Sequence, residues 1–128
     1  MILLIIAQFL ICVKDPLSPN NFGIVQKLNK FAFLPANWDG YNADAPSQVA
    51  IKQARYFVYQ FNQEEIQVYF TAPGPNGEVL LELKNDKKAV EIYFYEETES
   101  DYCLFEQNNP IGEGKTSSGL NQIIDFIK

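Results

Sequence analysis

The sequence predicts a single α+β domain, with two or three helices packed on one face of a four-stranded antiparallel meander and a helix at the C-terminus. Apolar residues have helical spacing between residues 20 and 61 and then alternate with period two between residues 66 and 106. Short connections separate the alternating segments, and such connections require antiparallel neighbours. A chain of 128 residues suits one domain with one core.

Residues 1–13, MILLIIAQFLICV, form an apolar N-terminal element. They have no basic start and no small-residue cleavage site, and they fall short of the ~20 apolar residues that span a membrane. We expect an ordered, mostly buried element in the core or in a subunit interface, with a targeting segment as the alternative. The first interpretation predicts a cytoplasmic protein without membrane attachment.

Two amphipathic helices are expected between residues 20 and 61. Asn20 or Asn21 is suited to cap a helix that runs to about Phe31. Ser47 is suited to cap a second helix that runs to about Phe61. Their apolar faces contain Ile24, Leu28, Phe31, Ala50, Ala54, Phe57, Val58 and Phe61.

Four strands are expected after the helices, at residues 66–70, 78–84, 89–95 and 102–106. Alternation assigns one face of the sheet to the core, with Ile66, Val68, Phe70, Val79, Leu81, Leu83, Val90, Ile92 and Phe94. A C-terminal helix within residues 119–128 adds Leu120, Ile123, Ile124 and Ile127 at helical spacing.

The opposite face of the predicted sheet is rich in tyrosine and acidic side chains. It collects Tyr69, Leu80, Glu82, Glu91, Tyr93 and Tyr95, followed by Cys103 or Tyr102 according to the register of the last strand. Such a surface is typical of protein-binding patches, because tyrosine buries a large area at low entropic cost. The alternative is a second core that residues 1–13 cover.

Residues 37–46 form a turn-rich segment between the two helices and contain the only tryptophan. Gly40 permits a positive-φ turn, and Asp39 is suited to cap neighbouring amides. We therefore expect a structured corner in which Trp38 is largely buried against the flanking helices or the sheet edge. If Trp38 is exposed instead, then Trp38, Asp39 and Tyr41 are candidate binding residues.

The same segment carries a family resemblance. Its residues Leu34-Pro35, Asn37-Trp38-Asp39-Gly40-Tyr41, Ala43 and Pro46 resemble a signature of small uncharacterised bacterial proteins. In those proteins the motif is followed by an Ala-x-x-Phe helix, a Pro-Gly hairpin and a strand that reads Leu-Glu-Trp. This chain has Ala54 and Phe57 in the helix but Leu81-Glu82-Leu83 in the strand, without the second tryptophan. The resemblance implies a fold and no activity.

Residues 109–116, NPIGEGKT, nearly match the phosphate-binding motif G-x-x-x-x-G-K-[ST], with Asn109 in place of the first glycine. A phosphate loop needs that glycine for close backbone approach and a parallel sheet around it. Too few residues follow Thr116 to build one. We therefore expect a flexible loop that leads into the terminal helix.

The composition excludes several kinds of site. The chain has no histidine, which excludes Ser-His-Asp, Cys-His and histidine-ligated metal mechanisms. A formal net charge of −6 argues against nucleic-acid and anionic-membrane partners, which need clustered Lys or Arg. Cys12 and Cys103 are far apart in apolar surroundings, which favours two buried free thiols, with one long-range disulfide as the alternative. We expect no cofactor and no metal site.

These observations predict a non-enzymatic bacterial protein-interaction module, whose partner is a basic protein or a second copy of the chain. An immunity- or antitoxin-like role is its concrete version, since small acidic proteins suit the neutralisation of basic ones. The alternative is a small enzyme that uses carboxylates and tyrosines without histidine. Asp39 with Asp44, or Glu82 with Glu91, would then form an acid/base pair or hold a divalent cation, although neither spacing is diagnostic.

Overall fold

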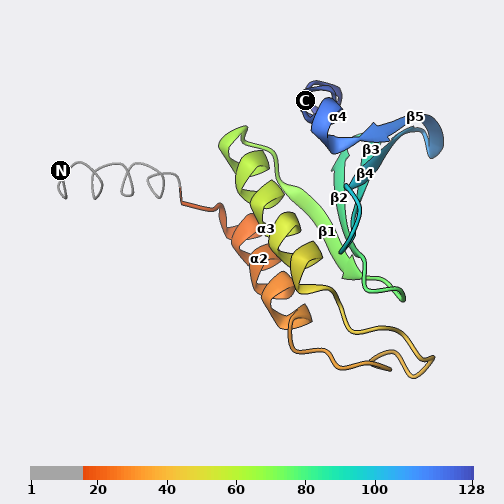
Figure 1. Cartoon of the computed structure of the whole chain (residues 1–128). Coiled ribbons are helices and arrows are strands. Elements are labelled where there is room, and N and C mark those ends of the chain that lie inside the picture. Colours follow the sequence, from red (N-terminus) through yellow and green to blue (C-terminus); the bar gives the residue numbers. More distant parts are fainter. Residues whose placement is uncertain (1–15) are drawn as a thin grey trace, which may run out of the picture.

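The computed structural model describes residues 16–128 and arranges them as three helices and a five-stranded antiparallel sheet (Figure 1). The helices are α2 (Pro19–Phe31), α3 (Gln48–Gln63) and α4 (Thr116–Ile127). The strands are β1 (Val68–Pro73), β2 (Val79–Asn85), β3 (Lys88–Phe94), β4 (Asp101–Glu106) and β5 (Asn109–Lys115), and they neighbour one another in chain order. The predicted α+β meander is confirmed, with one strand more than expected. The buried element expected at residues 1–13 lies outside the described residues.

The two longer helices begin at serine caps. Ser18, rather than Asn20 or Asn21, caps α2, because its Oγ accepts a hydrogen bond from the Asn21 backbone N–H at 3.1 Å. The Asn21 side chain is buried inside the domain instead. Ser47 caps α3 as predicted, and its Oγ accepts from the Ala50 backbone N–H at 3.1 Å.

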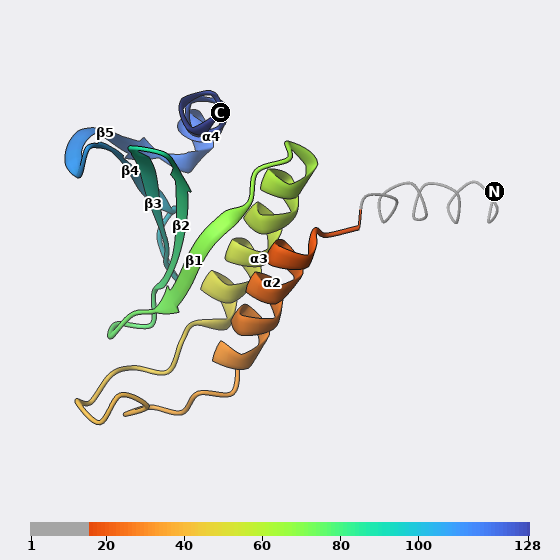
Figure 2. The ribbon, with the colours of Figure 1, turned by 180° about the vertical axis from the view of Figure 1, so that it is seen from behind.

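All three helices lie on the same face of the sheet, as two opposite views show (Figures 1 and 2). α2 packs on β1, α3 packs on β2 and β3, and α4 packs on β2 to β5. The core between the layers includes Leu28, Ala54, Val58, Phe61, Leu81, Leu83, Ile92, Phe94 and Ile123. Within residues 16–128, no helix has the length and apolar character needed to cross a membrane.

Phe70 is the exception to the predicted inner face. Val68 pairs with Leu83 and Phe70 pairs with Glu82, so Tyr69 is an extra residue that forms a β-bulge. The bulge reverses the alternation, and Phe70 lies on the face away from the helices with 43% of its surface exposed. Alternation predicts the wrong face for Phe70 because it counts the bulge residue as an ordinary strand position.

The prediction of a flexible loop at residues 109–116 is wrong, because β5 occupies most of this segment. Gln107 and Asn108 have positive φ values of 51° and 68°, and their turn returns the chain along β4. Gly114 serves close packing rather than flexibility, since a Cβ there would lie 2.9 Å from the Tyr102 hydroxyl oxygen. The segment is an extended edge strand, whereas a phosphate-binding loop would have to turn here.

Candidate functional site

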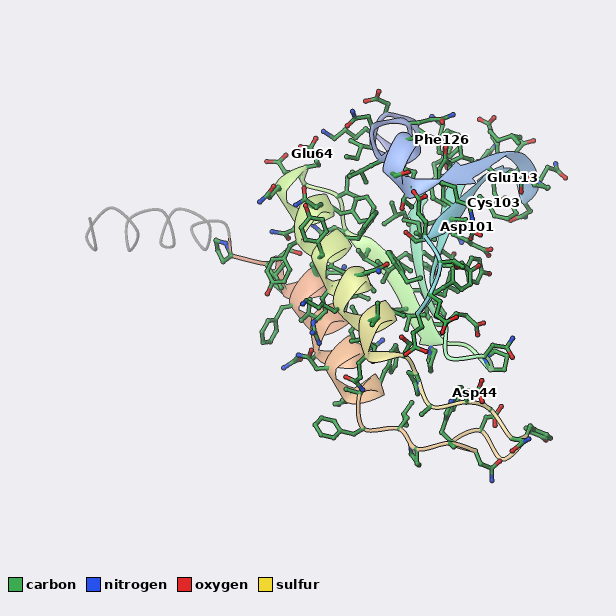
Figure 3. All side chains as sticks on the ribbon, in the orientation of Figure 1. Asp44, Glu64, Asp101, Cys103, Glu113 and Phe126 are labelled. Atoms are coloured by element: carbon green, nitrogen blue, oxygen red, sulfur yellow. The ribbon has the colours of Figure 1, made fainter. Side chains whose placement is uncertain are left out.

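Most of the predicted binding residues meet on the face of the sheet opposite the helices, which we call the outer face. Within residues 16–128, no helix lies on this face (Figures 1 and 2). Figure 3 labels Asp101, Cys103 and Glu113, which lie on the strands rather than on the helical layer. The outer face comprises Tyr69, Phe70, Leu80, Glu82, Glu91, Tyr93, Tyr95, Asp101, Cys103 and Glu113.

The register of β4 places Cys103 on the outer face and Tyr102 in the core. Cys103 has a free thiol and is half-buried, so the expectation of a buried thiol is wrong for this residue. It lies between two glutamate positions rather than in apolar surroundings. Cys12 lies outside the described residues.

Three glutamates form a line across the sheet, which we call the acidic row: Glu82 on β2, Glu91 on β3 and Glu113 on β5. Glu82 lies opposite Glu91. On β4, Cys103 lies between Glu91 and Glu113, because it pairs with Glu91 on one side and with Glu113 on the other. Like charges that face each other on neighbouring strands repel. Partial burial, followed by the charge of Glu91, raises the pKa of Glu82, and the charge of Lys84 opposes this increase.

The acidic row belongs to no ion pair in the described part of the chain. The two ion pairs there join Lys115 Nζ to Asp101 Oδ2 at 3.6 Å and Lys128 Nζ to Glu64 Oε1 at 3.1 Å. Among the same residues, no group of three or more Asp, Glu or Cys side chains is arranged to hold a metal ion. The row therefore presents negative charge that a cationic group of another molecule would neutralise.

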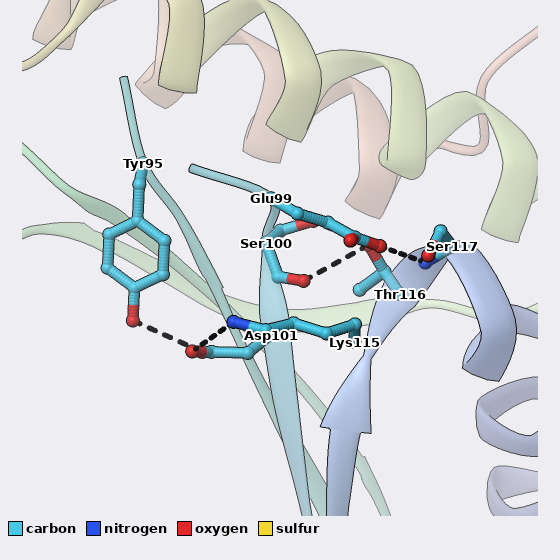
Figure 4. Close-up of polar contacts among 7 residues, drawn as sticks. All are labelled: Tyr95, Glu99, Ser100, Asp101, Lys115, Thr116 and Ser117. Carbon is cyan, nitrogen blue, oxygen red and sulfur yellow. Dashed lines mark hydrogen bonds and ion pairs between the residues drawn. The ribbon is translucent and has the colours of Figure 1, made fainter. Parts of the chain in front are cut away.

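Tyr93 and Tyr95 form a ridge beside the acidic row. The Tyr93 hydroxyl donates to Glu91 Oε2 and the Tyr95 hydroxyl donates to Asp101 Oδ1, both at 3.1 Å. Figure 4 shows Asp101 between Tyr95 and Lys115. A hollow of about 480 Å³ lies on one side of the ridge and one of about 370 Å³ lies on the other, since both tyrosines line both hollows.

Tyr93, Tyr95 and Cys103 all hold their protons more tightly than the free side chains do, because their pKa values are raised. Burial is the main cause that raises the pKa of Tyr93, and burial followed by the charge of Asp101 raises the pKa of Tyr95 to about 12. Burial, followed by the charge of Glu113, also raises the pKa of the Cys103 thiol. A tyrosine or a cysteine acts as a nucleophile or base only when it is ionised, which a lowered pKa favours, whereas a neutral hydroxyl donates hydrogen bonds.

Tyr69 and Phe70 extend the outer face to the edge strand β1. The Lys84 ammonium group lies over the Tyr69 ring, 5.0 Å from its centre. Phe70 lies opposite Glu82 and adds an exposed ring at the end of the acidic row. Sequence reasoning missed Phe70, because no residue type marks the bulge that turns it outward.

The loop at residues 32–47, which connects α2 to α3, holds the other predicted binding residues. Asp39 Oδ1 accepts two hydrogen bonds from backbone N–H groups of the loop, at 2.8 and 3.1 Å, as its predicted capping role requires. Trp38 Nε1–H donates to the Asp44 carbonyl oxygen at 3.0 Å. Trp38 is half-buried, which falls short of the largely buried side chain that was expected. The loop runs away from the helices and closes on itself (Figure 1).

A third hollow, of about 610 Å³, lies between α3 and the start of α4. Glu99 at this hollow accepts a hydrogen bond from the Ser117 backbone N–H at 2.8 Å (Figure 4). Hydrogen bonds from the side chain and backbone of Ser117 lower the pKa of Glu99. The N-cap residue of α4, Lys115, makes no side-chain capping bond, so Glu99 caps this helix from another segment. Capping explains this cluster without a ligand.

No protein-family model matches this chain. No curated protein and no solved structure matches it at a significant level either. The resemblance of residues 34–46 to small bacterial proteins therefore stays a prediction.

Proposed function

We propose that the protein is a non-enzymatic interaction module whose outer face binds a basic protein. The acidic row is the observation that carries this proposal. Glu82 and Glu91 face each other on adjacent strands, and neither takes part in an ion pair within residues 16–128. Such a pair is unfavourable in the isolated molecule and becomes favourable when cationic groups of a partner lie over it.

The tyrosine ridge adds contact area to the electrostatic attraction of the acidic row. Tyr93 and Tyr95 are half-buried, and their hydroxyls are already held by carboxylates of the same face. A partner would therefore meet ordered rings, which lose little conformational entropy on binding. The hollows on both sides of the ridge are suited to receive protruding arginine or lysine side chains.

A basic partner is better supported than the other two possibilities. Two copies of the chain that docked through this face would bring two acidic rows together, which charge repulsion disfavours. An enzyme that used Tyr93, Tyr95 or Cys103 as its base or nucleophile would need that group ionised, whereas the pKa values of all three are raised. The concrete role that we propose is neutralisation of a basic protein in the bacterial cytoplasm, in the manner of immunity proteins and antitoxins.

A pair of matched double variants tests this proposal. Glu82→Gln with Glu91→Gln neutralises the acidic row, whereas Glu97→Gln with Asp125→Asn makes the same change in net charge at exposed positions elsewhere. The immobilised full-length protein is exposed to an extract of the cells that produce it, and the bound protein is identified, purified and titrated against each variant.

We expect a basic partner whose affinity falls at least about tenfold with the acidic-row variant and stays within about twofold with the control. Raised salt should weaken binding to the wild-type protein more than binding to the acidic-row variant. Equal losses with both variants, or a partner without net positive charge, would contradict the proposal.

A further inference from the structure

The loop at residues 32–47 is braced by its own hydrogen bonds. The Asn37 N–H donates to the Ala43 carbonyl oxygen, and Asn37 Oδ1 accepts from the Asn42 N–H, both at 2.7 Å. Asn37, Gly40 and Asn42 have positive φ values of 65°, 78° and 66°. Asparagine and glycine tolerate this left-handed conformation better than other residues do, so the three positions hold the loop in one defined shape.

The braced loop displays aromatic rings to solvent. Tyr41 is 89% exposed and Phe33 is 87% exposed, while Trp38 is half-buried and held by its bond to the Asp44 carbonyl oxygen. Aromatic side chains are favoured contacts at the centre of protein interfaces. A loop that is ordered before binding presents them at low entropic cost.

The loop also adjoins the outer face. Two backbone hydrogen bonds of 2.9 Å, from Asp44 to Pro75 and from Ser47 to Gly77, fasten it to the turn between β1 and β2. Residues of the same turn line the hollow of about 370 Å³ beside Tyr93. From the helices, the loop runs past this turn toward the side of the sheet away from them (Figures 1 and 2), and Figure 3 labels Asp44 on this stretch.

We infer that the basic partner of the outer face is also held by this loop, with the Tyr41 ring as the second point of contact. The inference rests on the proposed function. A partner that fills the hollow beside Tyr93 extends over the β1–β2 turn and meets the loop there. The exposed face of the Tyr41 ring attracts an arginine or lysine of the partner by a cation–π interaction, so the loop recognises the same chemistry as the acidic row.

Site-specific photocrosslinking tests the two-point contact. In full-length protein made in its native cells, p-benzoylphenylalanine replaces Tyr41, Tyr93 or Tyr59 in turn. Tyr59 is the matched control, because it is an exposed tyrosine on α3, in the helical layer. After irradiation, mass spectrometry identifies each adduct. We expect the same basic protein at positions 41 and 93 and no adduct of it at position 59.

The outcomes separate the two claims. An adduct at position 93 without one at position 41 overturns the loop contact and leaves the proposed function standing. No adduct of a basic protein at position 93 overturns the proposed function and the inference with it, and equal adducts at all three positions do the same because they indicate unspecific contact.

A binding measurement with the purified partner gives a second readout. Tyr41→Ala should lower the affinity about tenfold, which is typical of a central aromatic contact. The fluorescence of Trp38 in the free variant should equal that of the wild-type protein, because the hydrogen bonds of the loop do not use the Tyr41 side chain. An unchanged affinity would overturn the inference.

Discussion

Glu82 on β2 and Glu91 on β3 lie directly opposite each other, and their register is fixed from the other side of the sheet. On that side Leu81 pairs with Ile92 and Leu83 pairs with Val90, and all four are fully buried. A slip of one residue would move these side chains out of the core, so the two glutamates cannot move apart. The core thus imposes a like-charge pair on the outer face.

Neutralising one member of this pair should stabilise the protein. Glu82→Gln is expected to raise the free energy of unfolding near neutral pH by about 0.2–1 kcal/mol, because it removes repulsion by Glu91. Urea denaturation of the two proteins measures this difference. Glu97→Gln, at an exposed position in the β3–β4 connection, is the control and should change stability by less than about 0.5 kcal/mol.

The same substitution should alter the pH dependence. The pKa of Glu82 is raised in the folded state, so the folded protein takes up this proton more readily than the unfolded chain. That contribution stabilises the wild-type protein at low pH and is lost as the pH rises through the raised pKa. The advantage of Glu82→Gln should therefore shrink as the pH is lowered from about 7 to about 4. An advantage that grew on acidification would contradict this assignment.

The tyrosine ridge should matter for binding more than for stability. Replacing Tyr93 and Tyr95 by serine is expected to lower partner affinity at least about tenfold. Phe94→Ala, one position away on the buried face, should cost about 3–5 kcal/mol of stability, and the double tyrosine variant should cost less than half of that. Denaturation and binding of the same preparations measure both effects. A large stability loss with unaltered affinity would place the tyrosines in a second core.

The helices and the central strands could be predicted because their signals are local. Ser47 is a cap with helical spacing behind it, and the alternation along β2 and β3 has no interruption. The acidic row follows from the same alternation, apart from Glu113. Glu113 joins the row only because residues 109–115 form the strand β5, and the glycines and proline of this segment are typical of a loop instead.

The remaining differences depend on contacts between distant segments. Gly114 lies in a strand because the Tyr102 ring passes beneath it, and Glu99 caps α4 from 18 residues away in sequence. Neither contact can be recognised from the local sequence of the residues that make it. Trp38 was expected to be largely buried against the helices or the sheet edge because of its size, but its indole N–H donates to the Asp44 carbonyl oxygen of its own loop and the side chain is half-buried.

Asn21 ties α2 to β1 inside the core. Its Nδ2 donates to Asn62 Oδ1 at 3.0 Å and to the Ile66 carbonyl oxygen at 3.1 Å, and its Oδ1 accepts from the Val68 N–H at 2.9 Å. Asn21→Leu should cost about 3 kcal/mol, because it leaves buried polar groups unpaired. Asn29→Ala, which removes an exposed side-chain hydrogen bond on the same helix, should cost less than about 0.5 kcal/mol. Similar losses of stability in the two variants would contradict this role of the Asn21 side chain.

Two glycines in helices should respond in opposite ways to alanine. A Cβ at Gly119 would overlap the Tyr102 ring, which is buried and whose hydroxyl donates to Gln122 Oε1 at 2.8 Å, so the ring cannot swing aside without losing this bond. Gly119→Ala is therefore expected to lower the free energy of unfolding by about 1–3 kcal/mol. A Cβ at Gly23 on α2 would meet open space. Gly23→Ala should therefore raise the free energy of unfolding by about 0.5–1 kcal/mol, because alanine lowers the entropy of the unfolded chain. Urea denaturation of both variants measures the contrast, and a gain in stability for Gly119→Ala would show that α4 is not held against the Tyr102 ring.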